Sequence, residues 1–459
     1  MSTKSGQHGL VLGGGFAGIL AAHVLAAHMD SVTVVERDVL PSRPEPRKGV
    51  PQARHSHLFM GAGARTADAL VPGLLDAWTE AGAQLLAAPS DVAFLTKYGW
   101  LPRTAHDEFV LCCSRGLLDW VMRDRVLRNE RITVLTETEA VGLTGDARRV
   151  TGAELRHRTS GERTVLEADF IVAATGRSSR VDDWLAPLGV PRIPVEVVDA
   201  GTAYATRLFR PTPEMHRDTP GIVMIANVTG EATGGVLLPL ENGLWTATVI
   251  GMRGSEPPTS DEEFQDFAKR LSHPAMAELI SAATPQGTAR GFRGLLNRRL
   301  RFEKLPRHPE GLVVLGDAAC TLNPSHAHGL TVAASAVAAM RAHLRRHGAV
   351  PAVAGRAQRA VSRSAVTAWQ LSVNDDLRHP DVVGPRLSPM VRAQNYYADR
   401  VMLAATRQPD VTRALLDVIA LAAPVTSLMR PRVLTASFRN AGGSPTDSSA
   451  DPLFQPRGA

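Results

Sequence analysis

The chain has 459 residues, of which 44% are hydrophobic and 21% are charged, and this balance is that of a globular protein and excludes an intrinsically disordered chain. The formal net charge is +6, but the basic residues are scattered and only 5% of the residues are aromatic, so we expect no nucleic-acid partner. The three cysteines, two of them adjacent, do not suggest a disulfide framework.

The beginning of the chain, MSTKSGQHG, lacks the apolar segment of a secretion signal. No apolar run in the sequence approaches the roughly 18 residues that a membrane-spanning helix needs. We therefore expect a cytoplasmic protein that makes no contact with a membrane.

Residues 9–36 have the pattern of a dinucleotide-binding unit. A short apolar strand precedes Gly13, Gly15 and Gly18, which form G-x-G-x-x-G at the start of an apolar helix, and a second strand, SVTVV, leads to Glu36. In such a unit the glycines allow a tight turn, the approach of a pyrophosphate and close packing of the helix, while the acidic residue accepts hydrogen bonds from a ribose. The helix N-terminus binds the phosphates. The segment predicts one dinucleotide site.

Two pairs of histidines raise the question of a metal site: His55 with His57, and His326 with His328. A metal would require both pairs to converge, and neither pair has an aspartate or glutamate beside it to complete a ligand set. We therefore expect no metal. Each imidazole has either a role in a pocket or an ordinary hydrogen-bonded or solvent-facing position, and the sequence leaves both open.

Residues 192–255 run apolar or alternate with β-branched residues, and ENG at 241–243 has the composition of a hairpin turn. This pattern predicts an antiparallel sheet. Helices are expected over 261–271, where Ser260 is the cap, and after Pro274.

Beyond residue 345 the pattern is helical, roughly over 352–376, 388–406 and 409–430, with prolines between the helices. We expect these helices to pack over a cavity formed by the rest of the chain. The last stretch, GGSPTDSSADPLFQPRGA, is rich in Gly, Pro and Ser and is expected to be disordered.

Three segments together resemble the group A flavin monooxygenases. They are the glycine pattern with Glu36, the segment IVAATGRSSRV at 171–181, and GDAACTLNPSHAHGLT at 316–331. CSRGLL around Arg115 also resembles a motif of that family. Bacterial flavin epoxidases of polyether biosynthesis and related flavin-fold cyclases are the most similar group, through RKGVPQARHSHLF and VDAGTAYATRLFR.

The resemblance implies an α/β fold, with a discontinuous Rossmann-like FAD-binding domain, an inserted antiparallel β-sheet substrate domain and a C-terminal helical region. The expected ranges are 1–185 and 301–345 for the FAD-binding domain, 186–300 for the substrate domain, 346–440 for the helical region and 441–459 for the disordered tail.

The resemblance also implies roles for particular residues. FAD would be bound by Gly13, Gly15, Gly18, Glu36, Arg115, Asp317 and Gly329. The candidates for orienting the substrate or acting in catalysis are Arg54, His55, His57 and His328. The helix expected over 329–341 would direct its N-terminus at the flavin ring, where it would stabilise negative charge on the reduced ring.

By this resemblance the protein is expected to be an FAD-dependent monooxygenase of bacterial secondary metabolism. It would insert one oxygen atom, through a flavin C4a-hydroperoxide, into a hydrophobic polyketide- or terpenoid-like substrate by epoxidation or hydroxylation. Electrons would come from NAD(P)H or from a separate flavin reductase. The alternative is a redox-silent, FAD-bound cyclase that forms decalins by [4+2] chemistry in spirotetronate- or spirotetramate-type pathways. A halogenase is disfavoured because the signature W-x-W-x-I-P is absent.

Three positions depart from the pattern of the family. Thr175 stands where the family has Asp before Gly176, and this argues against direct reduction by NADPH. Ala327 stands where the family has Gly close to the flavin ring, so its methyl group is expected to matter if the local φ is positive. Cys320 stands where the family often has His, so this position supplies no acid or base.

Overall fold

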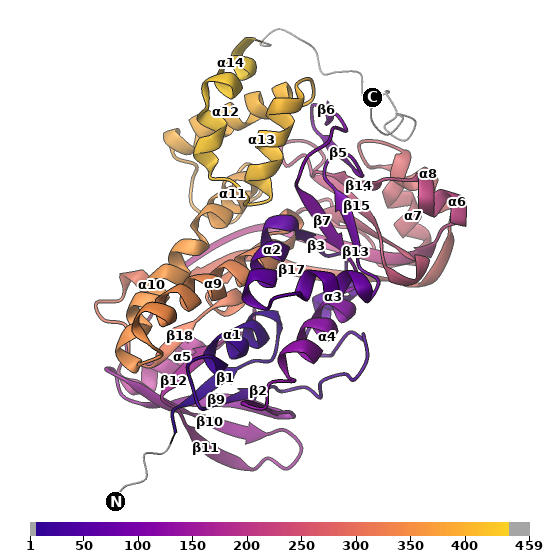
Figure 1. The fold of residues 1–459 in the computed structure, drawn as a ribbon. Coiled ribbons are helices and arrows are strands. Elements are labelled where there is room, and N and C mark those ends of the chain that lie inside the picture. Colours follow the sequence, from indigo (N-terminus) through magenta and orange to yellow (C-terminus); the bar gives the residue numbers. More distant parts are fainter. Residues whose placement is uncertain (1–5, 440–459) are drawn as a thin grey trace, which may run out of the picture.

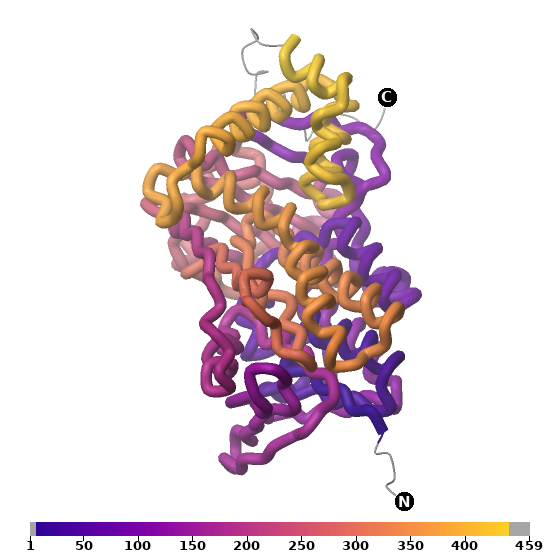
Figure 2. Tube along the Cα trace, turned by 90° about the vertical axis from the view of Figure 1, so that its left-hand side faces the viewer, coloured from indigo at the N-terminus to yellow at the C-terminus, as the bar shows by residue number. Residues whose placement is uncertain are grey.

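A computed structural model describes residues 6–439 of the chain (Figure 1). In the lower part of Figure 1 a parallel sheet is covered by helices, and a larger sheet lies above it on the right. The last helices, in yellow, lie at the end of the molecule opposite the N-terminus, as both views show (Figure 2). The expected disordered tail at 441–459 lies outside the described residues.

The parallel sheet has five strands. In spatial order they are β18 (Leu312–Val314), β12 (Phe170–Ala173), β1 (His8–Leu12), β2 (Ser31–Val35) and β8 (Ile132–Leu135). Leu10 in the central strand pairs with Ile171 on one side and with Thr33 on the other. The central strands are short apolar runs because both of their faces are buried.

Alternate side chains of these strands enter two different cores. Val11, Val34 and Val172 belong to a core shared with helices on one face of the sheet. Those helices include α1 (Phe16–Ala26), α4 (Arg115–Val126) and α9 (Gly329–His347). Leu12 and Ala173 belong to a second core on the other face, which is covered by the three-stranded sheet of β9 (Thr138–Gly145), β10 (Val150–His157) and β11 (Arg163–Glu167).

The larger sheet has eight strands. In spatial order they are β19 (Cys320–Thr321), β17 (Thr284–Leu300), β13 (Val195–Arg210), β16 (Trp245–Gly251), β15 (Thr233–Pro239), β14 (Gly221–Met224), β5 (Val92–Thr96) and β6 (Gly99–Trp100). The predicted antiparallel sheet is present, but its strands extend beyond the expected range 186–300 at both edges. The pair of β5 and β14 is parallel. The fold class predicted from the resemblance is confirmed.

Two helices lie between strands β16 and β17 of this sheet, and they begin where the sequence predicts. The first, α7 (Asp261–Lys269), starts at Ser260, whose side chain accepts a hydrogen bond from the backbone N–H of Glu263. The second, α8 (Ala275–Ala282), follows Pro274.

The C-terminal helices are more numerous than predicted. They are α10 (Ala354–Ser364), α11 (Val366–Asp376), α12 (Pro389–Ala405), α13 (Pro409–Ile419) and α14 (Pro431–Arg439). The helix predicted over 352–376 is divided at Ala365. The helix predicted over 409–430 ends early, because Leu421 has a φ of 60° and cannot continue a right-handed helix.

The remaining α-helices are α2 (Gly61–Leu70), α3 (Leu74–Glu80), α5 (Val181–Leu185) and α6 (Pro213–Asp218). The remaining strands, β3 (Leu58–Met60), β7 (Phe109–Cys112) and β4 (Gln84–Ala87), form an antiparallel sheet in this order. Within residues 6–439 we find no helix with the length and apolar character needed to cross a membrane.

Candidate active site

The glycine turn after β1 has the geometry that the sequence pattern predicts. Gly13 has a φ of +106°, and a Cβ atom there would lie 2.4 Å from the carbonyl oxygen of Ala174. A Cβ atom on Gly18 would lie 1.8 Å from the carbonyl oxygen of Gly13. Only glycine fits either position.

The N-terminus of α1 is open. A Cβ atom on Gly15 would meet only the Arg47 side chain, at 3.5 Å, and Gly15 makes no side-chain cap for the helix. The first turn contains no acidic residue. The backbone N–H groups of this turn are therefore placed to bind an anionic group such as a pyrophosphate.

Glu36 and Arg47 lie together beside the glycine turn. Glu36 accepts hydrogen bonds from the backbone N–H groups of Gly14 (2.8 Å) and Asp38 (3.0 Å), and Arg47 Nη1 lies 2.7 Å from its carboxylate. The buried Nε of Arg47 has no hydrogen-bond partner within residues 6–439. A guanidinium with a free N–H next to a helix N-terminus suits a phosphate. The sequence reasoning did not identify Arg47, whose only signal was its place in the segment RKGVPQ.

Arg115 and Asp317 approach the same edge from other elements. Arg115 is the first residue of α4, where Ser114 caps the helix, and its Nε donates to Asp119 at 2.8 Å. Asp317 follows β18 in a short turn and its carboxylate makes no hydrogen bond to the described residues. Burial raises the pKa of Asp317, and the charges of Arg177 and Arg115 partly oppose this.

These positions share one place in the topology. The glycine turn follows β1, Glu36 follows β2 and Asp317 follows β18, so all lie at the carboxyl ends of parallel strands. In open α/β sheets this edge is where ligands bind. The residues predicted to bind a dinucleotide are thus brought together, and their contacts with a cofactor remain a prediction.

The start of α9 offers a second uncapped helix end. The helix begins at Gly329 with neither a side-chain cap nor an acidic residue in its first turn, and a Cβ atom on Gly329 would meet no atom within 4 Å. Thr331 Oγ1, in the first turn, is buried without a hydrogen-bond partner within the described part of the chain. This end can receive a polar group from a ligand.

A cavity of about 500 Å³ lies between the large sheet, the loop at 324–328 and the C-terminal helices. Its walls are mainly apolar and include Phe94, Ile225, Val236, Ile250, Leu371 and Met402. Its polar lining includes residues of α11 and α12. Such a cavity suits a hydrophobic small molecule that carries a few polar groups.

The four candidate residues for catalysis or orientation are not all at this cavity. His55 and His328 line it, whereas Arg54 and His57 do not. Arg54 is exposed. The Nδ1 atom of His57 lies 2.8 Å from the carbonyl oxygen of His55. Of the four candidates, the structure thus places His55 and His328 at the cavity wall.

Two of the histidines that line the cavity, His55 and His328, are neutral at ordinary pH. Burial lowers the pKa of His55 to about 3, and its Nδ1 shares a hydrogen bond with Thr206 Oγ1 at 2.8 Å. Burial, with the charge of His326, lowers the pKa of His328 to about 4, and its Nε2 donates to the carbonyl oxygen of Ile419 at 2.9 Å.

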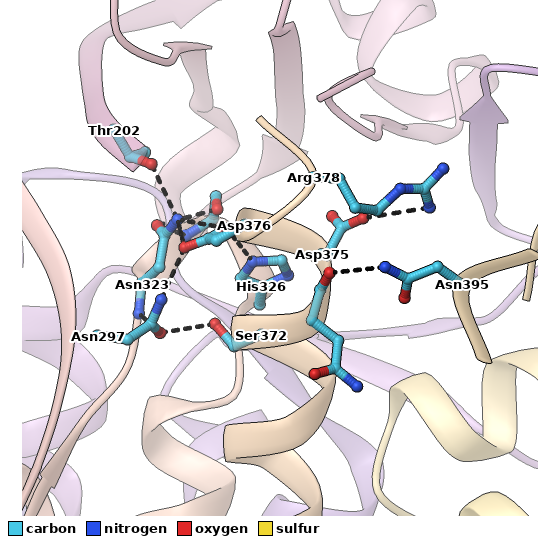
Figure 3. Close-up of polar contacts among 11 residues, drawn as sticks. Thr202, Asn297, Asn323, His326, Ser372, Asp375, Asp376, Arg378 and Asn395 are labelled. Carbon is cyan, nitrogen blue, oxygen red and sulfur yellow. Dashed lines mark hydrogen bonds and ion pairs between the residues drawn. The ribbon is translucent and has the colours of Figure 1, made fainter. Parts of the chain in front are cut away.

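The sequence reasoning missed a polar cluster at the base of the loop. His326 lines the cavity and lies 2.9 Å from the carboxylate of Asp376, which also contacts Asn297 and Asn323 (Figure 3). Asp376 lies in α11, in a segment predicted only to pack over the cavity. Its signal was the pair of adjacent aspartates, Asp375 and Asp376, in a helix that packs against the core.

Ala327 and Thr175, two positions at which the sequence differs from the family pattern, have different local structures. Ala327 has φ 56° and ψ 20°, the left-handed region that favours glycine, and it lines the cavity. Thr175 donates its hydroxyl to Ser179 at 2.7 Å, beside Gly176 with a φ of +75°. The methyl group of Ala327 is therefore held in a strained conformation at the cavity wall.

Within 6–439 no group of three or more His, Cys, Asp or Glu side chains is arranged to hold a metal ion.

Comparison with known proteins adds to this geometry. A family model described as an FAD binding domain matches residues 8–371. Protein Rv3254 of Mycobacterium tuberculosis is 30% identical over 418 residues, which are 88% of this chain and 87% of that protein. A flavoprotein/dehydrogenase from Cytophaga hutchinsonii has a similar structure, with a TM-score of 0.66, 15% identity and coverage of 94% of this chain and 96% of that chain. The p-nitrophenol 4-monooxygenase PnpA from Pseudomonas putida has a TM-score of 0.60 and 17% identity, with coverage of 90% and 98%.

Proposed function

Because this chain belongs to the family of FAD-binding domains, we propose that it is an FAD-dependent monooxygenase of bacterial secondary metabolism. It inserts one oxygen atom, by epoxidation or hydroxylation, into a hydrophobic polyketide- or terpenoid-like substrate. The similarity in fold to a protein named as a monooxygenase supports this activity.

The dinucleotide edge of the parallel sheet fits FAD. The open N-terminus of α1 and the guanidinium of Arg47 hold the pyrophosphate, and Glu36 accepts hydrogen bonds from the ribose. Asp317, whose carboxylate has no protein partner among the described residues, accepts hydrogen bonds from the ribityl hydroxyls. The N-terminus of α9 stabilises negative charge on the ring.

The observation that carries the proposal is the position of the cavity. Residues Pro324 to His328 line it, and the uncapped N-terminus of α9 follows at once. When bound and reduced, FAD supplies the activation of molecular oxygen. The apolar walls would exclude water from the cavity and hold a hydrophobic substrate against this loop.

Thr175 bears on the electron source. Its hydroxyl is already bonded to Ser179, and it lacks the carboxylate that the related enzymes have before Gly176. We propose that NAD(P)H reduces the flavin slowly and that a separate flavin reductase supplies electrons.

The proposal is tested by the reaction of the reduced holoenzyme with oxygen. The bound FAD is reduced without oxygen and mixed rapidly with oxygenated buffer, and the flavin absorbance is followed. We expect a transient spectrum that differs from both reduced and oxidised FAD. Retention of oxidised FAD together with product formation in the absence of oxygen and reductant would instead indicate the redox-silent cyclase. A chain that retains no FAD would contradict both functions.

A further inference from the structure

Asp376 is a buried acceptor surrounded by donors. It is 0% exposed, and its carboxylate lies 2.7 Å from Asn297 Nδ2, 2.9 Å from Asn323 Nδ2 and 2.9 Å from His326 Nε2 (Figure 3). Asn297 is fixed in turn, because its Oδ1 accepts from Ser372 Oγ at 2.8 Å. A carboxylate in this position has only acceptor atoms to offer, so the hydrogen on His326 Nε2 is directed to Asp376.

This assignment leaves Nδ1 of His326 for a ligand. The ring lines the cavity with its side chain 16% exposed, and Nδ1 makes no hydrogen bond to the described residues. A neutral imidazole that donates from one nitrogen carries a lone pair on the other. His326 therefore presents a proton acceptor to the cavity, oriented from behind by a buried carboxylate.

The charge environment strengthens this acceptor. Burial lowers the pKa of His326, but the hydrogen bond and charge of Asp376, with the charge of Asp375, outweigh burial and raise it. His328, whose ring is stacked on that of His326 with centroids 6.2 Å apart, has no carboxylate partner in the described structure and a pKa of about 4. Of these two adjacent imidazoles, His326 is the stronger base.

The other charged groups facing this part of the cavity are occupied with one another. Arg378 Nη2 lies 2.8 Å from Asp399 and its Nη1 lies 3.7 Å from Asp375, while Lys97 Nζ lies 2.9 Å from Asp399. Burial raises the pKa of Asp375, and the charge of His326 opposes this. These ion pairs make one end of the cavity polar. Unlike the charged groups in them, His326 has both a nitrogen without a hydrogen bond to the described residues and a buried carboxylate partner.

We propose that His326 accepts the proton of an acidic O–H group of the substrate, with Asp376 as its positioning residue. The substrate O–H bond breaks, an Nδ1–H bond forms, and the substrate oxyanion remains paired with the imidazolium, with no transfer of electrons. Phenols and enols carry such a group, and an isolated alkene does not. The inference rests on the proposed function and selects hydroxylation of an electron-rich carbon over epoxidation.

The test uses the oxidised FAD holoenzyme and 4-nitrophenol, whose phenolate has its own absorbance band. At a pH below the pKa of the free phenol, we expect about tenfold more phenolate in the bound than in the free probe. His326→Gln should remove this excess, and Asp376→Asn should reduce it by lowering the apparent proton affinity of His326. Asp375→Asn is the matched control in the same helix and should retain most of the band.

A second variant and a control ligand complete the test. If Asp376→Asn does not fold, His326→Gln still tests the inference, because among residues 6–439 the side chain of His326 makes one hydrogen bond, to Asp376. 4-Nitroanisole lacks the O–H group and is the control ligand. Its affinity should not depend on pH between roughly 6 and 8.

Either of two results overturns the inference: the wild type shows no excess phenolate at saturating 4-nitrophenol, or His326→Gln keeps the whole excess. Oxygen and reductant are absent, so neither result depends on monooxygenase activity. Conversely, a normal phenolate band in an enzyme whose reduced FAD gives no transient with oxygen would contradict the proposed function alone.

Discussion

At the scale of single residues, Ala327 has a backbone conformation that is unfavourable for a residue with a methyl side chain. Its φ of 56° and ψ of 20° place it in the left-handed region, where a residue with a Cβ atom is less stable than glycine by roughly 1–2 kcal/mol. The residue lies two positions before the start of α9 and lines the cavity. Strain of this kind is often found where a loop contacts a ligand.

Replacing Ala327 with glycine should stabilise the protein by up to about 1 kcal/mol, because the steric strain removed exceeds the added backbone entropy. Urea unfolding of the FAD-bound protein measures this change. Ala339→Gly, in the regular part of α9, is the control and should destabilise by about 1 kcal/mol. A loss of stability in Ala327→Gly equal to that of the control would show that the strain is absent.

The carboxylate of Asp317 is expected to lower the stability of the protein without FAD and to increase the affinity for FAD. Burial raises the pKa of its carboxyl group, so above that pKa the buried charge destabilises the folded apoprotein, and this penalty is lost as the pH falls through it. Asp317→Asn should therefore make the apoprotein more stable at neutral pH and bind FAD about 10–100-fold more weakly. Thermal unfolding and fluorescence titration with FAD measure the two effects, with the exposed Asp146→Asn as control. Unchanged FAD affinity would remove Asp317 from the cofactor site.

At the scale of elements, the cap of α4 links helix stability to cofactor binding. Ser114 accepts a hydrogen bond from the backbone N–H of Leu117, and Arg115 follows it at the first helical position. Ser114→Ala should cost about 1 kcal/mol of stability and also weaken FAD binding, because Arg115 would lose its fixed position. Ser260→Ala, which removes the cap of α7, should lose similar stability and leave FAD affinity unchanged. Equal FAD affinities in the two variants would contradict this role of α4.

Features of the fold that lie within one short segment could be predicted from the sequence, whereas contacts between distant segments could not. The unit at residues 9–36 was predictable because strand, glycine turn, helix and acidic residue follow one another within a short stretch. The partnership of His326 with Asp376 was not, because 50 positions separate them and the contact depends on how α11 packs. The break at Ala365 was also invisible, since no Gly or Pro marks it.

At the scale of the whole molecule, the cavity depends on parts of the chain that are distant in sequence. The strand β5 joins the large sheet by pairing with β14, although more than 120 residues lie between them. The C-terminal helices then close the cavity from the other side. Non-local strand pairing of this kind leaves no local pattern, so the sequence did not indicate that β5 and β6 join this sheet.

The buried histidines should make the whole protein sensitive to acid. Burial lowers the pKa of His308 from its usual value of about 6.5 to about 4, so the stability that its neutral form contributes is lost as the pH falls from about 6.5 towards 4. His55, His57 and His328 have lowered pKa values for the same reason, whereas the raised pKa of His326 acts in the opposite direction.

We expect His308→Gln to lose about 1 kcal/mol less stability than the wild type when the pH is lowered from 6.5 to about 5.5. Urea unfolding at the two pH values measures this difference. His308 lies outside the cavity, so FAD binding provides an independent check that the fold is intact. The exposed His347→Gln should behave as the wild type, and a wild-type response in His308→Gln would show that this histidine is not the cause.

We propose that this chain uses FAD to transfer one atom of molecular oxygen to a substrate in the cavity. The most direct measurement is a single turnover of the reduced holoenzyme under ¹⁸O₂ with a panel of hydrophobic phenols, enols and alkenes, followed by mass spectrometry of the products. We expect a product that contains one ¹⁸O atom and that forms only when both reduced FAD and oxygen are present. A product without ¹⁸O, formed equally by the oxidised enzyme in the absence of oxygen, would contradict it.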